Sequence, residues 1–261
     1  MRTERRIVVI TGASSGIGLG LLNYFESVGD TVLDVSLDGR DYACDISDPK
    51  ALKKVIDDIY KSHGNIDILI SCAGYGLSGA VELIDEAAAK KQFDVNFFGT
   101  SNLCKYAIAK MNDNGKIILL SSAAALFPVP FKAYYCASKA AVDSFARCLK
   151  MELSKTNIQV TSICPGDIKT NFTENRIKNY QTNARYGNSI KFVTEPTEKT
   201  EAKRMNKEVA IKKIYNICEK EKLKPRYIVG AKYKCLNFFR KILPNSWFEK
   251  IIKNKFIKKE K

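Results

Sequence analysis

The stretch Arg6-Ile-Val-Val-Ile-Thr-Gly-Ala-Ser-Ser-Gly-Ile-Gly18 joins an apolar run to three closely spaced glycines. Residues 6–10 predict a fully buried strand, and the apolar residues spaced along 16–28 predict a helix with one buried face. Glycines between them allow a tight turn and a close backbone approach to a ligand, and the helix start directs unpaired N–H groups at an anion. We therefore expect a dinucleotide pyrophosphate here rather than a plain strand-to-helix connection, with contacts from Gly12, Ser14, Ser15, Gly16, Ile17 and Gly18.

The same alternation of strand and helix continues along the chain. We expect further strands at 31–37, 66–70, 116–121, 158–163 and 226–230, and helices at 49–62, 87–112, 134–154 and 207–221. Repeated strand-helix-strand units predict parallel pairing through right-handed crossovers. The predicted fold class is therefore α/β, a doubly wound, Rossmann-like parallel sheet in a single domain over 1–230. Within it, the polar stretch 171–206 is expected to form a mobile substrate lid.

Composition excludes several classes of protein. With 261 residues, 45% of them hydrophobic and 27% charged, the chain is neither disordered nor a coiled coil. The single histidine, His63, rules out a His-rich metal site, and we expect no metal at all. Eight cysteines without CxxC spacing predict small buried residues in a reducing cytoplasm. No stretch is long and apolar enough to predict a membrane-spanning helix.

The positive charge of the chain is concentrated at one end. Residues 1–170 hold 19 Lys and Arg and 19 Asp and Glu, whereas residues 171–261 hold 24 and 9. Such a tail suggests a surface for something anionic, either a lipid headgroup layer or nucleic acid. Because no nucleic-acid-reading motif is present, we expect no nucleic-acid partner.

Residues 231–261 predict two basic amphipathic helices separated by Pro244. The first has Cys235, Leu236, Phe239, Ile242 and Leu243 on one face, and the second has Trp247, Phe248, Ile251, Ile252 and Phe256. Apolar faces among lysines are typical of peripheral membrane contacts, which would make the cytoplasmic protein membrane-associated. Alternatively these faces cover a substrate pocket or a subunit interface, and both roles are compatible.

The pentapeptide Tyr135-Cys-Ala-Ser-Lys139 places a phenol and an ammonium one helical turn apart on one face. A free phenol titrates near ~10, and a positive charge beside it favours the ionised form. The pair therefore suits an acid/base that works closer to neutral pH. Ser122 lies 13 residues before Tyr135, at the end of the preceding strand, where open α/β sheets present functional groups.

These motifs resemble those of the short-chain dehydrogenase/reductase family. Residues 11–18 match the family's TGxxxGxG motif, and Ser122, Tyr135 and Lys139 match its Ser-Tyr-Lys spacing. The resemblance implies that Ser122 hydrogen-bonds the substrate oxygen and that Tyr135 gives or takes its proton. It also implies that Lys139 lowers the tyrosine pKa and binds the nicotinamide ribose. Asn96 resembles the asparagine that holds a water between the lysine and solvent.

Other cofactor contacts are implied by the same resemblance. Asp45 resembles the family aspartate that contacts the adenine. Ser71-Cys-Ala-Gly74 stands where the family has NNAG, so Ala73 and Gly74 match while both asparagines are missing. Residues 165–170 resemble the PGxxxT segment that closes over the nicotinamide amide, through Pro165, Gly166, Ile168 and Thr170.

The choice of nicotinamide cofactor depends on the end of the second strand. Asp38, 20 residues past Gly18, would accept a hydrogen bond from the adenosine ribose and favour NAD(H). Family spacing instead puts the deciding position at Ser36, which has no charge to repel a 2′-phosphate, and Arg40 offers a cation to attract one. The prediction is NADP(H) in preference to NAD(H).

The resemblance implies an NAD(P)-dependent oxidoreductase that moves hydride between nicotinamide and an alcohol or ketone carbon. The tail is similar to the hydroxysteroid and retinol dehydrogenase branch, which implies a lipophilic substrate such as a steroid, a retinoid or a fatty carbonyl. It also implies a homodimer or homotetramer through helices 87–112 and 134–154. The alternative is a dinucleotide-binding regulator without turnover, which the missing asparagines at Ser71 and Cys72 favour.

Overall fold

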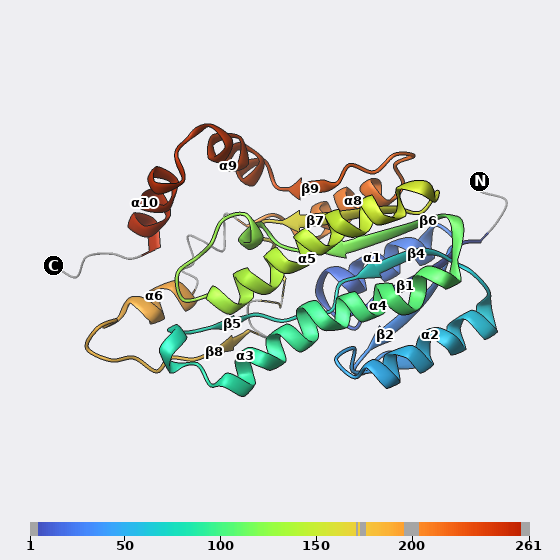
Figure 1. Ribbon diagram of the computed structural model, residues 1–261, viewed down its shortest axis with the longest axis horizontal. Helices are drawn as coiled ribbons and strands as arrows, with labels where there is room; N and C mark the ends of the chain where they lie inside the picture. The colour runs from blue at the N-terminus through green and yellow to red at the C-terminus, as the bar shows by residue number, and fades with distance from the viewer. Residues whose placement is uncertain (1–4, 171, 173–175, 196–203, 257–261) are drawn as a thin grey trace.

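The computed structural model describes residues 5–170, 172, 176–195 and 204–256 (Figure 1). Its central sheet has seven parallel strands in the order β3-β2-β1-β4-β6-β7-β9. In chain order these are β1 (Ile7–Thr11), β2 (Thr31–Ser36), β3 (Tyr42–Ala43), β4 (Ile66–Ser71), β6 (Met111–Leu120), β7 (Gln159–Pro165) and β9 (Arg226–Val229). Since the chain adds strands on one side of β1 and then on the other, the sheet is doubly wound, as predicted.

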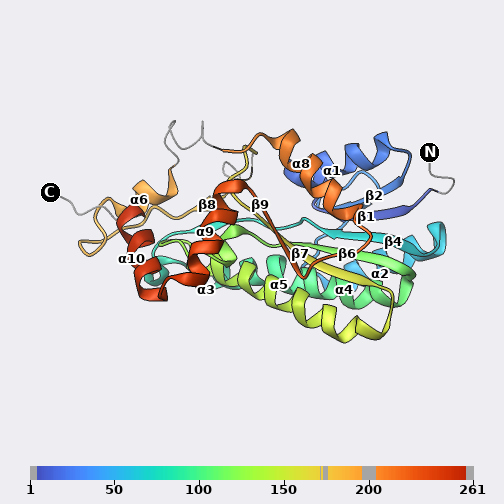
Figure 2. The same cartoon turned by 90° about the horizontal axis from the view of Figure 1, so that it is seen from above.

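Helices cover both faces of this sheet (Figure 2). One face packs against α1 (Gly16–Ser27) and α8 (Lys207–Cys218), and the other against α2 (Pro49–His63), α4 (Thr100–Ala107) and α5 (Ala133–Glu152). Side chains of β1 alternate between the two cores: Val8 and Ile10 join the first, and Val9 the second. Burial on both faces explains the continuous apolar strands.

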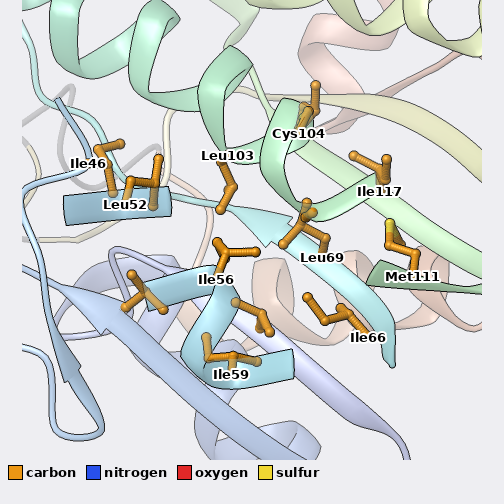
Figure 3. Close-up of a cluster of buried hydrophobic side chains, with 14 of the residues drawn as sticks. Ile46, Leu52, Ile56, Ile59, Ile66, Leu69, Leu103, Cys104, Met111 and Ile117 are labelled. Carbon is orange, nitrogen blue, oxygen red and sulfur yellow. The ribbon is translucent and has the colours of Figure 1, made fainter. Parts of the chain in front are cut away.

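Figure 3 shows part of the core under α2 and α4. Ile56 and Ile59 of α2 lie there with Leu69 of β4 and Leu103 of α4, and all four are 0% exposed. The three-to-four-residue spacing of apolar side chains along α2 is what predicted this helix and this buried face. The prediction that the cysteines are buried is wrong for Cys148 and Cys235, which are exposed.

The predicted helix over 87–112 is interrupted. It begins as α3 (Glu86–Phe93), passes through the π-helical segment η2 (Asp94–Gly99) and continues as α4. Strand β6 begins at Met111, ahead of the predicted start at residue 116. A π-helical turn widens the helix locally and is frequent at functional sites, and periodicity does not reveal it.

The segment 171–206 contains secondary structure that the sequence pattern did not predict. Strand β8 (Ile177–Lys178) pairs in parallel with β5 (Leu77–Ser78), and α6 (Ser189–Thr194) follows. Ile190 of α6 is 1% exposed, so this segment has an apolar anchor. Its predicted mobility stays a prediction, and residues 171, 173–175 and 196–203 lie outside the described residues.

The tail folds as α9 (Ala231–Ile242) and α10 (Asn245–Phe256), with α10 beside α6 in both views (Figures 1 and 2). The Phe248 side chain is 6% exposed and packs on Phe127, with ring centroids 5.6 Å apart. Other members of the predicted apolar faces are exposed, namely Phe239, Ile242, Trp247 and Ile251. Within the described part of the chain, no helix has the length and apolar character needed to cross a membrane.

Candidate active site

The glycine turn between β1 and α1 is closely packed against main-chain atoms, both its own and those that follow β4. Gly12 adopts a φ of +69°, and a Cβ there would lie 2.7 Å from the Ala73 backbone. A Cβ at Gly18 would lie 2.2 Å from the carbonyl oxygen of Gly12. Only glycine fits either position, so the turn keeps its shape and leaves the first N–H groups of α1 directed at the space in front of it.

Ser122 and Tyr135 come together at the carboxyl end of β6. Ser122 begins the short turn after the strand, where its Oγ accepts a hydrogen bond from Ala124 N (3.1 Å). Tyr135 lies in the first turn of α5, is 8% exposed, and lines the same cavity as Ser122. Burial raises the pKa of the Tyr135 phenol, while the nearby Ser122 hydroxyl and the charge of Arg176 act to lower it.

Lys139 lies one turn after Tyr135 and is 5% exposed. Its Nζ donates a hydrogen bond to Leu120 O (2.9 Å), and burial lowers the pKa of the ammonium to about 8. The cation whose charge lowers the tyrosine pKa in the structure is Arg176, and the expected effect of Lys139 on that pKa stays a prediction.

Asn96 and Lys139 converge on Gly74, where a Cβ would lie 2.9 Å from Asn96 Oδ1 and 3.3 Å from Lys139 Nζ. The buried Asn96 amide belongs to the π-helical segment η2. It accepts a hydrogen bond from Tyr75 N (3.0 Å) and donates to Tyr75 O (3.0 Å) and to Ser138 Oγ (3.0 Å). Through Asn96, these bonds connect the segment that follows β4 to α5.

The remaining predicted cofactor residues lie on neighbouring loops. Asp45 Oδ1 accepts from Ser47 Oγ (2.6 Å) and its Oδ2 from Lys91 Nζ (3.0 Å), which lowers the pKa of the carboxyl. Ser71, in place of a family asparagine, has its Oγ 3.0 Å from Thr100 Oγ1. After β7, Gly166 N donates to Val229 O (3.0 Å), which joins this loop to β9.

Ser36 and Arg40, the residues predicted to select NADP(H), both have partners within the protein. Ser36 Oγ donates to Asp34 Oδ1 (2.5 Å) and accepts from Ser14 N (3.3 Å), so it connects β2 to the glycine turn. The Arg40 guanidinium forms ion pairs with Glu26 (2.8 Å) and Asp41 (3.2 Å). Its charge is therefore already balanced by two carboxylates.

One cavity of about 640 Å³ contains nearly all of these groups. Its lining runs from the glycine turn past Asp45, Gly74 and Tyr135 to the loop that follows Pro165. Asn96 is fully buried behind Gly74 and does not reach the cavity. The structure thus brings together the predicted residues Gly12, Ser14, Ser15, Gly16, Ile17, Gly18, Ser36, Asp45, Ala73, Gly74, Ser122, Tyr135, Lys139, Pro165, Gly166, Ile168 and Thr170.

Comparison with known proteins agrees with this arrangement. The family model described as short chain dehydrogenase matches residues 36–181, more than half of the chain. The chain belongs to the short-chain dehydrogenase family. A probable short-chain type dehydrogenase/reductase from Helicobacter pylori (strain J99), VdlC, is 32% identical to this dehydrogenase over 261 residues, covering 95% of this chain and 96% of the relative. A 3-ketodihydrosphingosine reductase from Bacteroides thetaiotaomicron is 34% identical over 182 residues, covering 66% and 68%.

Solved structures share the fold of this dehydrogenase. A short-chain dehydrogenase from Streptomyces avermitilis has a TM-score of 0.80 at 23% identity, covering 96% of this chain and 98% of that one. A short chain dehydrogenase from Burkholderia cenocepacia, in complex with NADP, has a TM-score of 0.74 at 21% identity, covering 98% and 100%. Family, fold class and enzyme class are as predicted: this is an NAD(P)-dependent dehydrogenase/reductase.

Sequence reasoning missed several residues that line the cavity of this dehydrogenase. The cations Lys132, Arg176 and Arg204 belong to no motif, and nothing in the local sequence distinguishes them from surface residues. The tail contributes an apolar wall to the cavity. Covering a substrate pocket was one of the roles considered for the amphipathic pattern of 231–261, beside membrane contact. That wall consists of Tyr233, Leu236, Phe248, Ile251 and Ile252.

Proposed function

We propose that this dehydrogenase moves hydride between nicotinamide and an alcohol or ketone carbon of a lipophilic substrate, with Tyr135 as the acid/base. The observation that carries the proposal is the position of the buried Tyr135 phenol, which lies in the same cavity as Ser122 and the glycine turn. Lys139 follows on the same face of α5. A phenol beside a hydroxyl can share one substrate oxygen with it, which is what carbonyl reduction requires.

In the proposed mechanism, Ser122 donates a hydrogen bond to the substrate oxygen and Tyr135 transfers the proton. Because burial raises the pKa of Tyr135, its phenol is protonated at neutral pH and suits proton donation to a carbonyl oxygen. In the direction of oxidation, the same phenol oxygen receives the proton of the alcohol. Lys139 and Arg176 add positive charge that favours the phenolate formed after proton donation.

The glycine turn fits a nicotinamide dinucleotide, since Gly12 and Gly18 leave no room for a Cβ and α1 begins without an acidic side chain in its first turn. The nicotinamide supplies or accepts the hydride when bound. We propose a preference for NADP(H), because the side chain of Ser36 has no charge to repel a 2′-phosphate. Arg40 joins in this recognition by exchanging Glu26 for the phosphate.

A lipophilic substrate fits the wall contributed by the tail. Leu236, Phe248 and Ile252 form an apolar cluster with Phe127 beside the loop after β6, which carries Ser122. Burying an alkyl or ring system against such a wall contributes about 25 cal/mol per Å² of apolar surface. The Bacteroides relative is a reductase of 3-ketodihydrosphingosine, which supports a ketone as substrate class here.

The outer side of the tail supports a peripheral membrane contact. Phe238, Ile242 and Trp247 are 61%, 63% and 65% exposed, among basic side chains of the same helices. Trp247 is the one tryptophan of the chain, so its emission reports on α10. We expect a blue shift with vesicles containing phosphatidylglycerol but not with pure phosphatidylcholine, and loss of binding in Phe238→Ser/Ile242→Ser. The control is Val81→Ser, which removes an exposed apolar side chain elsewhere.

A homodimer or homotetramer through α4 and α5 is part of the proposal. Phe98, just before α4, and Met151, near the end of α5, are 51% and 67% exposed. Exposed large apolar side chains on these helices suit a paired-helix interface. Light scattering of the purified protein and of Phe98→Ser/Met151→Ser tests this, with a smaller mass expected for the variant.

A turnover screen tests the activity. Steroid, retinoid and fatty ketones are each supplied with NADH and with NADPH, and nicotinamide absorbance is followed for the wild type and for Tyr135→Phe. We expect oxidation of the nicotinamide with a hydrophobic ketone and its loss in the variant. Tight binding of the cofactor without turnover of any compound would instead favour the dinucleotide-binding regulator.

A further inference from the structure

Positive side chains gather in the half of the cavity that holds Tyr135. Arg176 directly precedes β8, and Lys132 directly precedes α5, one turn before Tyr135. Both line the cavity together with Arg204 and Lys232. Asp167 is the carboxylate that lines this part of the wall, and its Oδ2 accepts a hydrogen bond from Tyr233. The described lining here thus has more positive than negative charge.

Arg176 is held against the reaction centre by its neighbours. The Phe172 ring contacts both Arg176 and the tyrosine: its centroid is 5.9 Å from the Tyr135 ring and 5.9 Å from Arg176 Cζ. A Cβ at Gly76 would lie 2.9 Å from Arg176 Nε, so the guanidinium rests on the main chain there. Nε is buried and has no hydrogen-bond partner among the described residues, which is costly for a charged group.

Lys132 follows a turn with a strained backbone and lines the cavity. The preceding residue, Phe131, has a φ of 59°, which is unfavourable for a bulky side chain. This conformation is held by a hydrogen bond from Gly79 N to Phe131 O (2.9 Å) and by the Phe131 ring against Tyr186, 5.7 Å between centroids. Burial and the charge of Arg176 lower the pKa of Lys132 to about 8, so most of it is still charged at neutral pH. Two like charges are thus held near each other.

An anion placed between Arg176 and Lys132 would offset the cost of burying their charges and the repulsion between them. The dinucleotide phosphates are expected elsewhere, because the glycine turn and Ser36 lie at the ends of β1 and β2 and the start of α1, whereas the two cations directly precede α5 and β8. We propose that Arg176 and Lys132 bind a carboxylate or phosphate group of the substrate, so that this dehydrogenase acts on lipophilic anions. This proposal rests on the proposed function for the position of the carbonyl at Tyr135.

Titration calorimetry in the presence of saturating NADP⁺ tests the anion site without requiring turnover. The probes are decanoate, decyl phosphate and decanol, which share an alkyl chain and differ in charge. We expect at least one of the two anions to bind roughly 10-fold or more tightly than decanol, since charge-assisted hydrogen bonds add this much. The anion that binds more tightly identifies the source of the negative charge as carboxylate or phosphate. Equal binding of all three probes would overturn the proposal.

Variants of the two cations test whether they cause the preference for anions. Arg176→Met and Lys132→Met should each reduce the preference for the anion by roughly 10-fold, whereas Arg176→Lys, which keeps the charge, should retain part of it. The control is Arg185→Met, in the same segment but paired with Glu82 (2.8 Å). Thermal unfolding shows which variants are folded. If the Met variants keep the anion preference, or weaken NADP⁺ binding instead, the cations do not recognise substrate.

Turnover separates this proposal from the proposed function. Long-chain oxo acids and their methyl esters are compared as substrates with the same cofactor. Reduction of both at equal kcat/KM would overturn the anion site while leaving the oxidoreductase intact. An anion preference in calorimetry without reduction of any ketone would overturn the proposed function and leave the anion site standing.

Discussion

The ammonium of Lys139 donates a 2.9 Å hydrogen bond to the carbonyl oxygen of Leu120, the last residue of β6. A second bond runs the other way, from Ser121 Oγ to Lys139 O (2.7 Å). Together they join α5 to the end of the strand from which Ser122 emerges. The relative position of Ser122 and Tyr135 therefore depends on main-chain contacts of the lysine as well as on its charge.

The pH dependence of stability should reveal the buried Lys139 ammonium. Burial lowers its pKa from 10.5 to about 8 in the folded protein. Between these values the unfolded chain binds more protons, so folded stability rises with pH and is lowest below about 8. Relative to Lys139→Met, the wild-type free energy of unfolding should gain about 2–3 kcal/mol from pH 7 to pH 10. Denaturant titrations at each pH measure these free energies. The contribution of Lys132 is present in both proteins and cancels in the comparison. Parallel dependence of the two free energies on pH would contradict the prediction.

Replacing the Tyr135 phenol by a phenyl ring should remove the proton donor. We expect Tyr135→Phe to lower kcat by roughly 10²- to 10⁴-fold while the melting temperature changes little. Initial rates with a reducible ketone measure this. The matched control is the neighbouring Tyr134→Phe, which should retain activity, and equal rates for the two variants would assign the chemistry to another group.

The packing of Gly18 on Gly12 should make the glycine turn intolerant of a methyl group. In Gly18→Ala the new Cβ would lie 2.2 Å from the Gly12 carbonyl oxygen, so the backbone must shift. We expect a loss of about 1–3 kcal/mol in the free energy of unfolding and a weaker affinity for NADP⁺. Gly29→Ala, at φ +93° with open space around it, should lose stability through backbone strain alone and keep its cofactor affinity.

Cofactor preference should respond to a cation at the end of β2. Leu37 is 74% exposed and lines the cavity next to Ser36. Leu37→Arg would offer the 2′-phosphate a guanidinium that, unlike Arg40, is not already paired with Glu26. We expect the ratio of kcat/KM for NADPH over NADH to rise roughly 10-fold. Leu37→Gln is the uncharged control, and an equal rise there would show that charge is not responsible.

Much of the fold could be predicted because its signals are local. A buried strand such as 7–11 is a continuous apolar run, and a helix such as α2 repeats its apolar residues every three or four positions. The π-helical segment at 94–99 could not be predicted in this way, because a single widened turn leaves the apolar periodicity nearly unchanged. Nor could β8, whose two residues are strand only because residues 77–78 lie beside them.

The sequence by itself determined the parts of the site whose spacing along the chain sets their geometry. The glycine turn and the Tyr135–Lys139 pair are of this kind, since a turn or one helical repeat places their members side by side. Only the tertiary structure decided that Arg176 lies on the Phe172 ring in the same cavity as Tyr135, that Glu26 pairs with Arg40, and which tail residues face the cavity. Such contacts join residues far apart in sequence, and they exist only after the sheet and its helices have packed together.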